Sequence, residues 1–440
     1  MAAELTVLQG ADEHDLTRLD EYQAIGGYES LERARGMEPA EVIEEITDAS
    51  LRGRGGAGFP MGRKLTLVPP SDKRSGPAYV VVNADESEPG AFKDREIMRR
   101  VPHRLIEGCL IAAHAIQAAA VFIYIRGEYL AEFLVLEAAI EEGRVADLYG
   151  DVQVILHRGA GAYICGEESA LLESLEGSRG QPRPRPPFPP VAGLYMQPTL
   201  INNVQTVASV PAIIELGVDR YKELGVESAP GTVVYSLSGN VNRPGNYELP
   251  LGTTLRQLIF EHGHGVAEGR ALKAIIPGGS SVPVFTPDQL DVPLDFDSVQ
   301  AAGSFLGSAA VIVVDDRACM VQLALRAEKF YMHESCGKCT PCREGTRWLV
   351  QLLEKIEGGD GTQADLDLVV SVCDRVLGKS LCALGDFAVW CVGSYVEKYR
   401  DEFQRHVDEG RCPYGGESSI EGVRAPSDQH THTAMAEVPA

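Results

Sequence analysis

The segment AYVVVNADESEPG at residues 78–90 decides the fold of the first half of the chain, because a β-branched strand ends abruptly in acidic turn residues. Helical patterns at residues 102–117 and 128–143 then alternate with apolar strand patterns at residues 120–125 and 151–159. Strands that alternate with helices of this length predict an α/β layer with a mostly parallel sheet.

Four polar residues stand at the end of the first of these strands: Asn83, Asp85, Glu86 and Glu88. Open α/β sheets bind their ligands at the carboxyl ends of the strands, so this segment is a candidate binding site. A solvated turn has the same composition. The segment by itself leaves both interpretations open.

The length and charge of the chain restrict its function. A chain of 440 residues is expected to form about three domains. The net charge of -23 opposes binding to nucleic acids, because a strongly acidic surface repels phosphate backbones. The sequence has no uninterrupted apolar run of about 18 residues that would predict a membrane span, and its acidic N-terminus does not resemble a signal peptide. These features predict a cytosolic protein.

Changes in composition and periodicity along the sequence predict four regions. Residues 1–230 form the α/β domain with an N-terminal extension. Residues 231–316 read as strand, turn, strand, short helix and strand, an order typical of a small ubiquitin-like β-grasp (SLBB-type) domain. Residues 317–408 have helical periodicity and predict a helical bundle. Residues 409–440 are polar and rich in Gly, Pro and Ser, which predicts a disordered tail in which His430 and His432 are solvated.

Three thiols at three-residue spacing, Cys336, Cys339 and Cys342, lie between the first two helices of the predicted bundle. Structural zinc usually takes two separated pairs of ligands, whereas one continuous turn of cysteines is typical of a [4Fe–4S] cluster. Zinc is the alternative. A fourth ligand is needed, and the downstream candidates are Cys373, Cys382, Cys391 and Cys412. Cys382 is favoured because it follows a break that contains glycine, although spacing alone does not decide among them.

The remaining cysteines are scattered, and disulfides are not expected in a reducing compartment. Each is interpreted as a small buried apolar residue or a bystander: Cys109, Cys165, Cys319, Cys373, Cys391 and Cys412.

Two loops rich in glycine surround the first strand. GRGGAGFP at residues 53–60 matches G-x-G-x-x-G, but a helical pattern precedes it, so a standard Rossmann fingerprint is excluded. Its backbone N–H groups can still surround a phosphate or a flat ring, and Arg54 and Lys64 supply positive charge. A plain structural turn is the alternative.

The second loop, GAGAYICGEE at residues 159–168, follows a strand and precedes a helix. Glu167 and Glu168 stand where an anion would otherwise bind. Carboxylates at this position can accept hydrogen bonds from the hydroxyls of a ribityl or ribose chain, and helix capping is an alternative that is compatible with this role.

A [4Fe–4S] cluster accepts single electrons, whereas a nicotinamide delivers a hydride that carries two. A protein that joins them needs a carrier that is stable at the one-electron stage, and flavin is the usual one. Two glycine loops and an acidic strand end are sufficient for a flavin and a nucleotide.

Five motifs in series, GRGGAGFP, NADESEPG, GAGAYICGEESALLESLEG, INNVQT and ESCGKCTPCREGT, closely resemble the family of NADH- and FMN-binding subunits of respiratory complex I. The resemblance extends from about Leu51 to Tyr399. The same motifs occur in diaphorase subunits of NAD-linked hydrogenases and formate dehydrogenases, which often carry additional iron–sulfur modules. A complex I subunit is preferred because this sequence has no second cysteine cluster.

The resemblance implies a Rossmann-like FMN- and NADH-binding domain, a β-grasp domain and a helical bundle that carries the cluster. It implies FMN, one [4Fe–4S] cluster and NADH as substrate. The residues implied to bind FMN are Gly53, Arg54, Gly55, Lys64, Asn83, Asp85, Glu86, Ser87, Tyr163, Gly166, Glu167, Glu168, Asn202, Asn203 and Thr206. Those implied for NADH are Phe59, Arg185, Phe188 and Glu88, the last near the nicotinamide, and those for the cluster are Cys336, Cys339, Cys342 and Cys382.

Three positions depart from the family pattern and affect the details of the adenine pocket: Met61, Leu65 and Arg185. The implied reaction is hydride transfer from NADH to FMN, followed by single-electron transfer to the cluster and onward. The implied partners are a thioredoxin-like [2Fe–2S] subunit and the large iron–sulfur subunit of complex I. The resemblance thus predicts a peripheral location on the cytoplasmic side of the inner (plasma) membrane.

Overall fold

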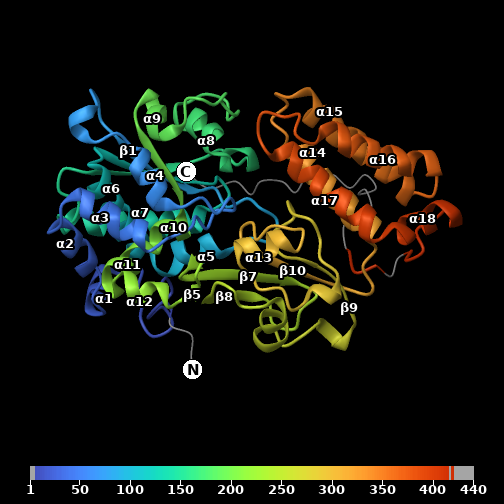
Figure 1. Ribbon diagram of the computed structural model, residues 1–440, viewed down its shortest axis with the longest axis horizontal. Helices are drawn as coiled ribbons and strands as arrows, with labels where there is room; N and C mark the ends of the chain where they lie inside the picture. The colour runs from blue at the N-terminus through green and yellow to red at the C-terminus, as the bar shows by residue number, and fades with distance from the viewer. Residues whose placement is uncertain (1–4, 416–417, 421–440) are drawn as a thin grey trace, which may run out of the picture.

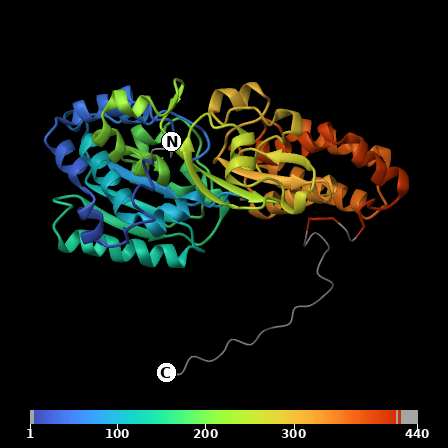
Figure 2. The ribbon, with the colours of Figure 1, turned by 90° about the horizontal axis from the view of Figure 1, so that it is seen from below.

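The computed structural model describes residues 5–415 and 418–420 as an elongated molecule. An α/β lobe lies at one end and a helical bundle at the other, with a small mixed sheet between them (Figures 1 and 2). None of the helices in the described part of the chain is both long enough and apolar enough to span a membrane.

The α/β lobe is built on a four-stranded sheet of β1 (Tyr79–Ala84), β2 (Ala120–Ile125), β3 (Gln153–Arg158) and β4 (Thr199–Asn203). The strand order is β3-β2-β1-β4, and every pair is parallel. The prediction of a parallel sheet is confirmed. Since all four strands end at one edge, Asn83 of β1 lies directly opposite Asn203 of β4.

Helix α6 (Pro102–Ile116) is buried along almost its whole length, because it packs on β1 and β2 on one side and on N-terminal helices on the other. The other helices of this lobe are α1 (Leu19–Ala24), α2 (Glu29–Arg35), α3 (Pro39–Asp48), α4 (Met61–Leu67), α5 (Lys93–Arg100), α7 (Leu130–Val145), α8 (Glu168–Leu175), α9 (Pro189–Ala192), α10 (Val204–Ala208), α11 (Val210–Leu216) and α12 (Val218–Lys222), with short turns η1 (Ser71–Lys73), η2 (Tyr163–Gly166) and η3 (Leu194–Met196).

Helix α4 follows the first glycine loop directly, and the sequence patterns did not predict it. Its seven residues are too few to show a helical period, and the Pro-rich segment that follows suggests a loop. The helix matters because it carries Lys64 beside the carboxyl end of β4, where Lys64 Nζ donates a hydrogen bond to the Ile201 carbonyl oxygen at 2.9 Å.

The central sheet consists of β7 (Thr232–Gly239), β8 (Gly245–Pro250), β9 (Leu272–Ile276) and β10 (Ala310–Asp315) in the order β8-β7-β10-β9. The two inner strands are parallel and the outer pairs are antiparallel, which confirms the β-grasp prediction. The remaining elements are β5 (Gly225–Val226), β6 (Ala229–Pro230), η4 (Gln257–His262), η5 (Ala267–Gly269), η6 (Pro287–Gln289) and α13 (Phe296–Ala301).

The C-terminal helices are α14 (Met320–Glu334), α15 (Thr340–Glu357), α16 (Gln363–Val376), α17 (Leu384–Lys398) and α18 (Arg400–Glu409). They share one hydrophobic core, which includes Ala274 and Ile276 of β9, so the bundle packs against the β-grasp sheet. The helical bundle is confirmed, whereas the exact boundaries at residues 231, 317 and 409 stay predictions.

The beginning of the predicted disordered tail packs against the molecule. The Tyr414 hydroxyl accepts a hydrogen bond from Lys273 Nζ at 2.8 Å, and Ser419 Oγ donates to Asp315 Oδ1 at 2.9 Å. Disorder is therefore the wrong prediction for these residues, because single side chains anchor a segment whose average composition is polar. Residues 416–417 and 421–440, which include the two histidines predicted to be solvated, lie outside the described residues.

Candidate functional site

Two adjoining cavities of about 550 and 570 Å³ open at the carboxyl ends of β1 and β4. Both are lined by Gly55, Ala57, Asn83, Gly166 and Asn203, so they form one continuous cleft. This is the edge of a parallel sheet at which α/β proteins bind ligands. The combined volume suits a cofactor together with a nucleotide substrate.

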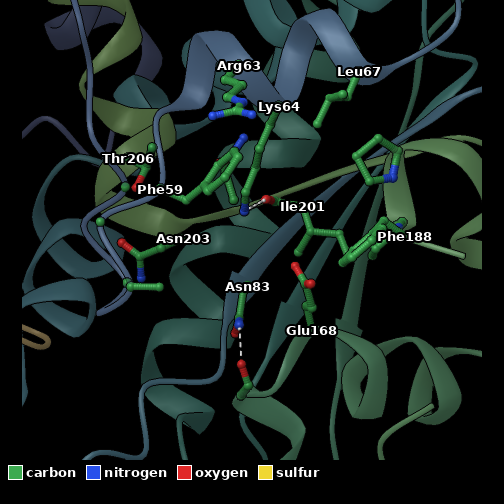
Figure 3. Close-up of a pocket in the computed structure, with 18 of the residues that line it drawn as sticks. Phe59, Arg63, Lys64, Leu67, Asn83, Glu168, Phe188, Ile201, Asn203 and Thr206 are labelled. Atoms are coloured by element: carbon green, nitrogen blue, oxygen red, sulfur yellow. Dashed lines mark hydrogen bonds between the residues drawn. The ribbon is translucent and has the colours of Figure 1, made fainter. Parts of the chain in front are cut away.

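The first cavity combines two exposed aromatic rings with a half-buried lysine, Lys64 (Figure 3). Phe59 and Phe188 are 38% and 55% exposed, which leaves ring surface available to a flat ligand. Burial lowers the pKa of the Lys64 ammonium, and nearby Glu168 opposes this effect. Arg185 Nη1 donates to Glu168 Oε1 at 2.8 Å, so Arg185 lies in this cavity but is already paired.

The second cavity is acidic. Burial raises the pKa of Asp85 to about 7, although its Oδ1 accepts a hydrogen bond from the Ser87 hydroxyl at 2.6 Å. Burial also raises the pKa of Glu86 to about 7. Glu86 accepts hydrogen bonds from two backbone N–H groups in the first turn of α5, those of Asp94 and Arg95, at 2.8 and 2.9 Å. One predicted ligand residue thus also caps a helix.

Glu88 lies where the α/β lobe meets the β-grasp domain. Its Oε2 accepts a hydrogen bond from Tyr163 Oη at 2.8 Å, and its Oε1 accepts one from the Ser281 backbone N–H at 2.8 Å. Burial raises its pKa and these donors act in the opposite direction. The carboxylate is therefore held in one orientation on the wall of the second cavity.

The second glycine loop approaches β1 closely. Asn83 Nδ2 donates to the Gly166 carbonyl oxygen at 2.8 Å (Figure 3). Glu167 accepts from the backbone N–H groups of Ser169 and Ala170 at 3.0 and 2.9 Å, so it caps α8 as the alternative interpretation predicted. In the first loop, a Cβ on Gly55 would lie 2.8 Å from Asn203 Cβ, so only glycine allows this approach.

The residues in the cleft fit a flavin mononucleotide. Asp85 Oδ2 and Asn202 Nδ2 are buried and have no hydrogen-bond partner in the protein, which leaves an acceptor and a donor for a polar ligand. Lys64 offers positive charge for a phosphate, and the glycine loops allow close backbone approach. Thr206 lines the first cavity beside Gly53, while its hydroxyl accepts the Arg54 backbone N–H at 2.8 Å.

The side chain of Arg54 does not face the cleft, which corrects the prediction that it supplies charge to the ligand. It is 2% exposed. Its guanidinium donates to the carbonyl oxygens of Pro230 and Thr232, at 2.8 and 3.2 Å, and so braces the glycine loop against the start of β7. The position of Arg54 in the glycine loop could not reveal where its side chain points, because the carbonyl acceptors lie about 180 residues away in the sequence.

Several residues that line the second cavity were missed by the sequence analysis. Lys93 and Asp94 at the start of α5 form a buried ion pair with an Nζ–Oδ1 distance of 2.6 Å, and Asp94 Oδ2 accepts from Asn203 Nδ2 at 2.6 Å. The charged pair Lys93 and Asp94, shortly after NADESEPG, is the sequence feature that could have identified them. Phe387 and Trp390 of α17 also line this cavity, and no local motif marks them.

The structure brings the four predicted cluster thiols together. Cys342 is buried, and Cys336, Cys339 and Cys382 pack around the same small core. Among the described residues, no three of these sulfurs lie within 4.8 Å of one another. Their arrangement around one core would suit a [4Fe–4S] cluster, which cysteine thiolates hold.

Cys382 also lines the second cavity, together with Glu88 and Tyr163. Burial raises the pKa of its thiol to about 11, so metal binding is needed to deprotonate it near neutral pH. The competing candidates Cys373 and Cys391 instead pack in the core of the bundle.

Three family models match the chain. Residues 46–212 match the Nuo51 FMN-binding domain, residues 234–285 match the SLBB domain, and residues 322–406 match the NADH-ubiquinone oxidoreductase-F iron-sulfur binding region. These matches support the cofactors predicted from the sequence, FMN and one [4Fe–4S] cluster.

Curated relatives and a solved structure extend this similarity to nearly the whole chain. The crystal structure of an NAD+-reducing [NiFe]-hydrogenase in the H2-reduced state has a TM-score of 0.80 at 33% identity, over 93% of this chain and 68% of that chain. The NADH-quinone oxidoreductase F subunit of Mycobacterium tuberculosis is 51% identical over 413 residues, which cover 92% of each chain. The second NADH-quinone oxidoreductase F subunit of Rhizobium meliloti is 49% identical over 420 residues, or 93% of this chain and 99% of the relative. The chain therefore belongs to the family of NADH-quinone oxidoreductase F subunits.

Proposed function

We propose that this chain is the electron-input subunit of an NADH:quinone oxidoreductase, which oxidises NADH at FMN and passes the electrons to a [4Fe–4S] cluster. The observation that carries the proposal is the second cavity, where Cys382 shares the wall with Glu88 and Tyr163. A flavin in this cleft and a cluster on the four thiols would be separated by little more than the lining of the cavity.

When bound, FMN accepts a hydride from NADH and releases the two electrons one at a time. The chain's own residues bind and orient the reactants. Lys64 offers charge to the phosphate, Asp85 and Asn202 offer unpaired polar atoms to the ribityl chain, and Tyr163 fixes the Glu88 carboxylate beside the nicotinamide. This role requires no nucleophilic side chain, since positioning contributes most of the acceleration.

The first cavity suits the adenine end of NADH. The exposed rings of Phe59 and Phe188 offer two stacking surfaces, and both line the cavity that contains Glu168 and Arg185. The acidic residues of the cleft would repel the extra 2′-phosphate of NADPH, which favours NADH as the substrate. Leu65 is buried and lies outside the lining of this cavity, so its departure from the family pattern affects packing.

A diaphorase role in an NAD-linked hydrogenase or formate dehydrogenase uses the same local chemistry. The two NADH-quinone oxidoreductase relatives are 49% and 51% identical to this chain, compared with 33% for the hydrogenase structure, so complex I is the better-supported assembly. Copurification distinguishes the two. Quinone-reductase subunits are expected, whereas a nickel or molybdenum subunit would indicate the diaphorase role.

Assembly into a multi-subunit respiratory complex follows from this role. We infer a thioredoxin-like [2Fe–2S] subunit and a large iron–sulfur subunit as partners, with the chain held at the cytoplasmic face of the membrane through them. Leu377 and Leu381, which are 43% and 39% exposed near Cys382, offer apolar surface beside the cluster for such contact.

Anaerobic titration of the full chain with NADH tests the proposal. Flavin absorbance should bleach first, and the EPR signal of a reduced [4Fe–4S] cluster should then appear. A protein that binds no flavin, or whose thiols hold a lone zinc ion, would contradict the proposal.

A further inference from the structure

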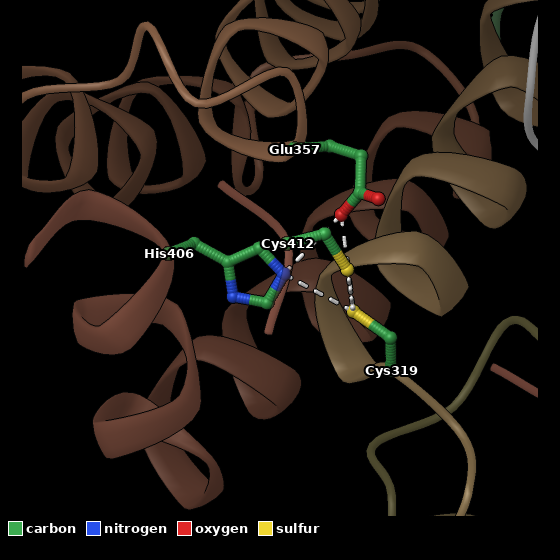
Figure 4. Close-up of side chains that lie close together, drawn as sticks. All are labelled: Cys319, Glu357, His406 and Cys412. Carbon is green, nitrogen blue, oxygen red and sulfur yellow. Dashed lines mark hydrogen bonds and ion pairs between the residues drawn. The ribbon is translucent and has the colours of Figure 1, made fainter. Parts of the chain in front are cut away.

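A second group of metal-binding side chains lies at the opposite end of the bundle from the cluster thiols. It consists of Cys319, Glu357, His406 and Cys412 (Figure 4). Cys319 caps the beginning of α14 and Glu357 ends α15, whereas the cluster thiols lie where α14 ends and α15 begins. The 15 residues of α14 place the two groups about 22 Å apart.

The four donor atoms form a compact set in which all lie within 4.8 Å of one another. Cys319 Sγ and Cys412 Sγ are 3.8 Å apart, the separation of about 3.8 Å expected for two sulfurs on a tetrahedral zinc ion with bonds of about 2.3 Å. His406 Nε2 lies 3.3 Å from both Cys319 Sγ and Glu357 Oε2. For nitrogen and oxygen bonds of about 2.0–2.1 Å, tetrahedral edges of about 3.3–3.6 Å are expected.

Neighbouring groups orient each ligand. His406 Nδ1 lies 2.8 Å from the Glu402 carbonyl oxygen, which selects the tautomer that leaves the Nε2 lone pair directed toward the sulfurs. Gln322 Nε2 donates to Glu357 Oε1 at 2.7 Å and leaves Oε2 available. The Gln322 backbone N–H also donates to Cys319 Sγ at 3.5 Å, at the helix end that stabilises a thiolate.

We propose that these four residues bind a structural Zn²⁺ ion. Zinc accepts two thiolates, an imidazole and a carboxylate as ligands in tetrahedral sites. The two sulfurs disfavour Mg²⁺ and Ca²⁺, because these cations prefer carboxylate and carbonyl oxygens. Binding deprotonates both thiols. Because the protein supplies all four ligands, the site is closed and has a structural rather than a catalytic role.

Glu357 and His406 belong to α15 and α18, Cys319 directly precedes α14, and Cys412 lies in the segment after α18. His406 is fully buried in α18, and Cys412 lies beyond the end of that helix. The ion would therefore hold the segment after α18 against the beginning of α14 and the end of α15. This explains why a segment of polar composition packs against the bundle. It also gives a role to Cys319, which the sequence suggested is a small buried apolar residue or a bystander, and to Cys412, which the sequence also offered as a candidate cluster ligand.

A disulfide between the two cysteines is the main alternative. It requires a sulfur separation of about 2.05 Å, and it would leave the orientation of His406 and Glu357 toward the thiols without a purpose. The two interpretations predict different chemistry for the same atoms.

The test measures zinc and iron together in the full-length chain with its flavin and cluster, after dialysis against EDTA. About one zinc ion per chain is expected. X-ray absorption at the zinc edge, which neither iron nor flavin affects, should give two sulfurs at about 2.3 Å and two lighter ligands at about 2.0–2.1 Å. Absence of zinc, zinc removed by dialysis (an adventitious ion only), a four-sulfur shell or a Cys319–Cys412 disulfide found by mass spectrometry would each overturn the proposal.

Variants test the ligand assignment. Cys412→Ser changes a half-buried residue near the end of the described chain and should lose zinc while iron and FMN contents stay at wild-type levels. His406→Cys should retain zinc with three sulfurs in its shell. Cys373→Ala is the matched control, because it removes a buried thiol from the same bundle and should keep the ion. Retention of zinc by Cys412→Ser would overturn the assignment, and if a variant does not fold, the wild-type absorption spectrum decides.

Discussion

The Tyr163 hydroxyl donates a 2.8 Å hydrogen bond to the Glu88 carboxylate, and this contact joins the second glycine loop to the end of β1. The other oxygen of Glu88 accepts from the Ser281 backbone N–H in the β-grasp domain. Tyr163 also packs edge-on against Phe330 of α14, with ring centroids 5.2 Å apart. One carboxylate thus links the three parts of the molecule at the wall of the cavity.

Glu88→Gln should reduce kcat/KM for NADH by roughly tenfold, corresponding to about 1.4 kcal/mol, because the proposed role of Glu88 is to place a fixed negative charge beside the nicotinamide. FMN content should remain unchanged, since the Tyr163 hydroxyl can accept a hydrogen bond from the new amide. Steady-state kinetics with an artificial acceptor measure kcat/KM for NADH, and flavin fluorescence measures the FMN content. If the Glu88→Gln variant has the same kcat/KM for NADH as wild type, Glu88 does not belong to the NADH site.

Asp85→Asn should make the stability of the flavin-free chain less dependent on pH. Burial raises the native pKa of Asp85 from 3.8 to about 7, so the native state keeps a proton that the unfolded chain loses above about pH 4. The native state therefore loses stability as the pH rises from about 4 to about 7, by up to roughly 4 kcal/mol for this group.

Melting temperatures of wild type and Asp85→Asn at pH 5 and pH 7.5 measure this effect. The decrease between the two pH values should be smaller in the variant. Asp72→Asn, which changes an exposed residue, should behave like wild type. Identical decreases in all three proteins would show that Asp85 is ionised in the native state throughout this range.

Lys64→Met should weaken FMN binding by about 10- to 100-fold, because a hydrogen bond to a charged group contributes about 1.5–3 kcal/mol. Titration of the flavin-free chain with FMN, followed by quenching of flavin fluorescence, gives the dissociation constant. Lys73→Met removes an exposed lysine from the same lobe and should leave the affinity unchanged. Equal affinity of the Lys64 variant and wild type would place the phosphate elsewhere.

Cys382→Ser should abolish the EPR signal of the reduced cluster while NADH still bleaches the flavin, since we propose this thiol as the fourth cluster ligand. Iron content should decrease in parallel. Cys109→Ala, which removes a thiol buried in α6, should keep both iron and signal. A full cluster signal in Cys382→Ser would assign the fourth ligand to another residue.

Sequence periodicity predicted the parallel sheet, the β-grasp module and the bundle, because burying one face of a strand or helix imposes a local repeat. Motif spacing likewise identified the three neighbouring thiols and the two glycine loops, whose function depends on consecutive backbone groups. It was misleading for Arg54, whose side chain binds carbonyl oxygens of Pro230 and Thr232.

The sequence by itself determined the types of element and the chemistry available to them, since both follow from residues close together in the chain. Only the tertiary structure decided which distant residues meet. It placed Cys382 and Trp390 on the wall that Glu88 also lines, and it gathered Cys319, Glu357, His406 and Cys412 around one point. The physical reason is that contacts between elements depend on packing of whole helices and sheets, for which a sequence carries no local signal.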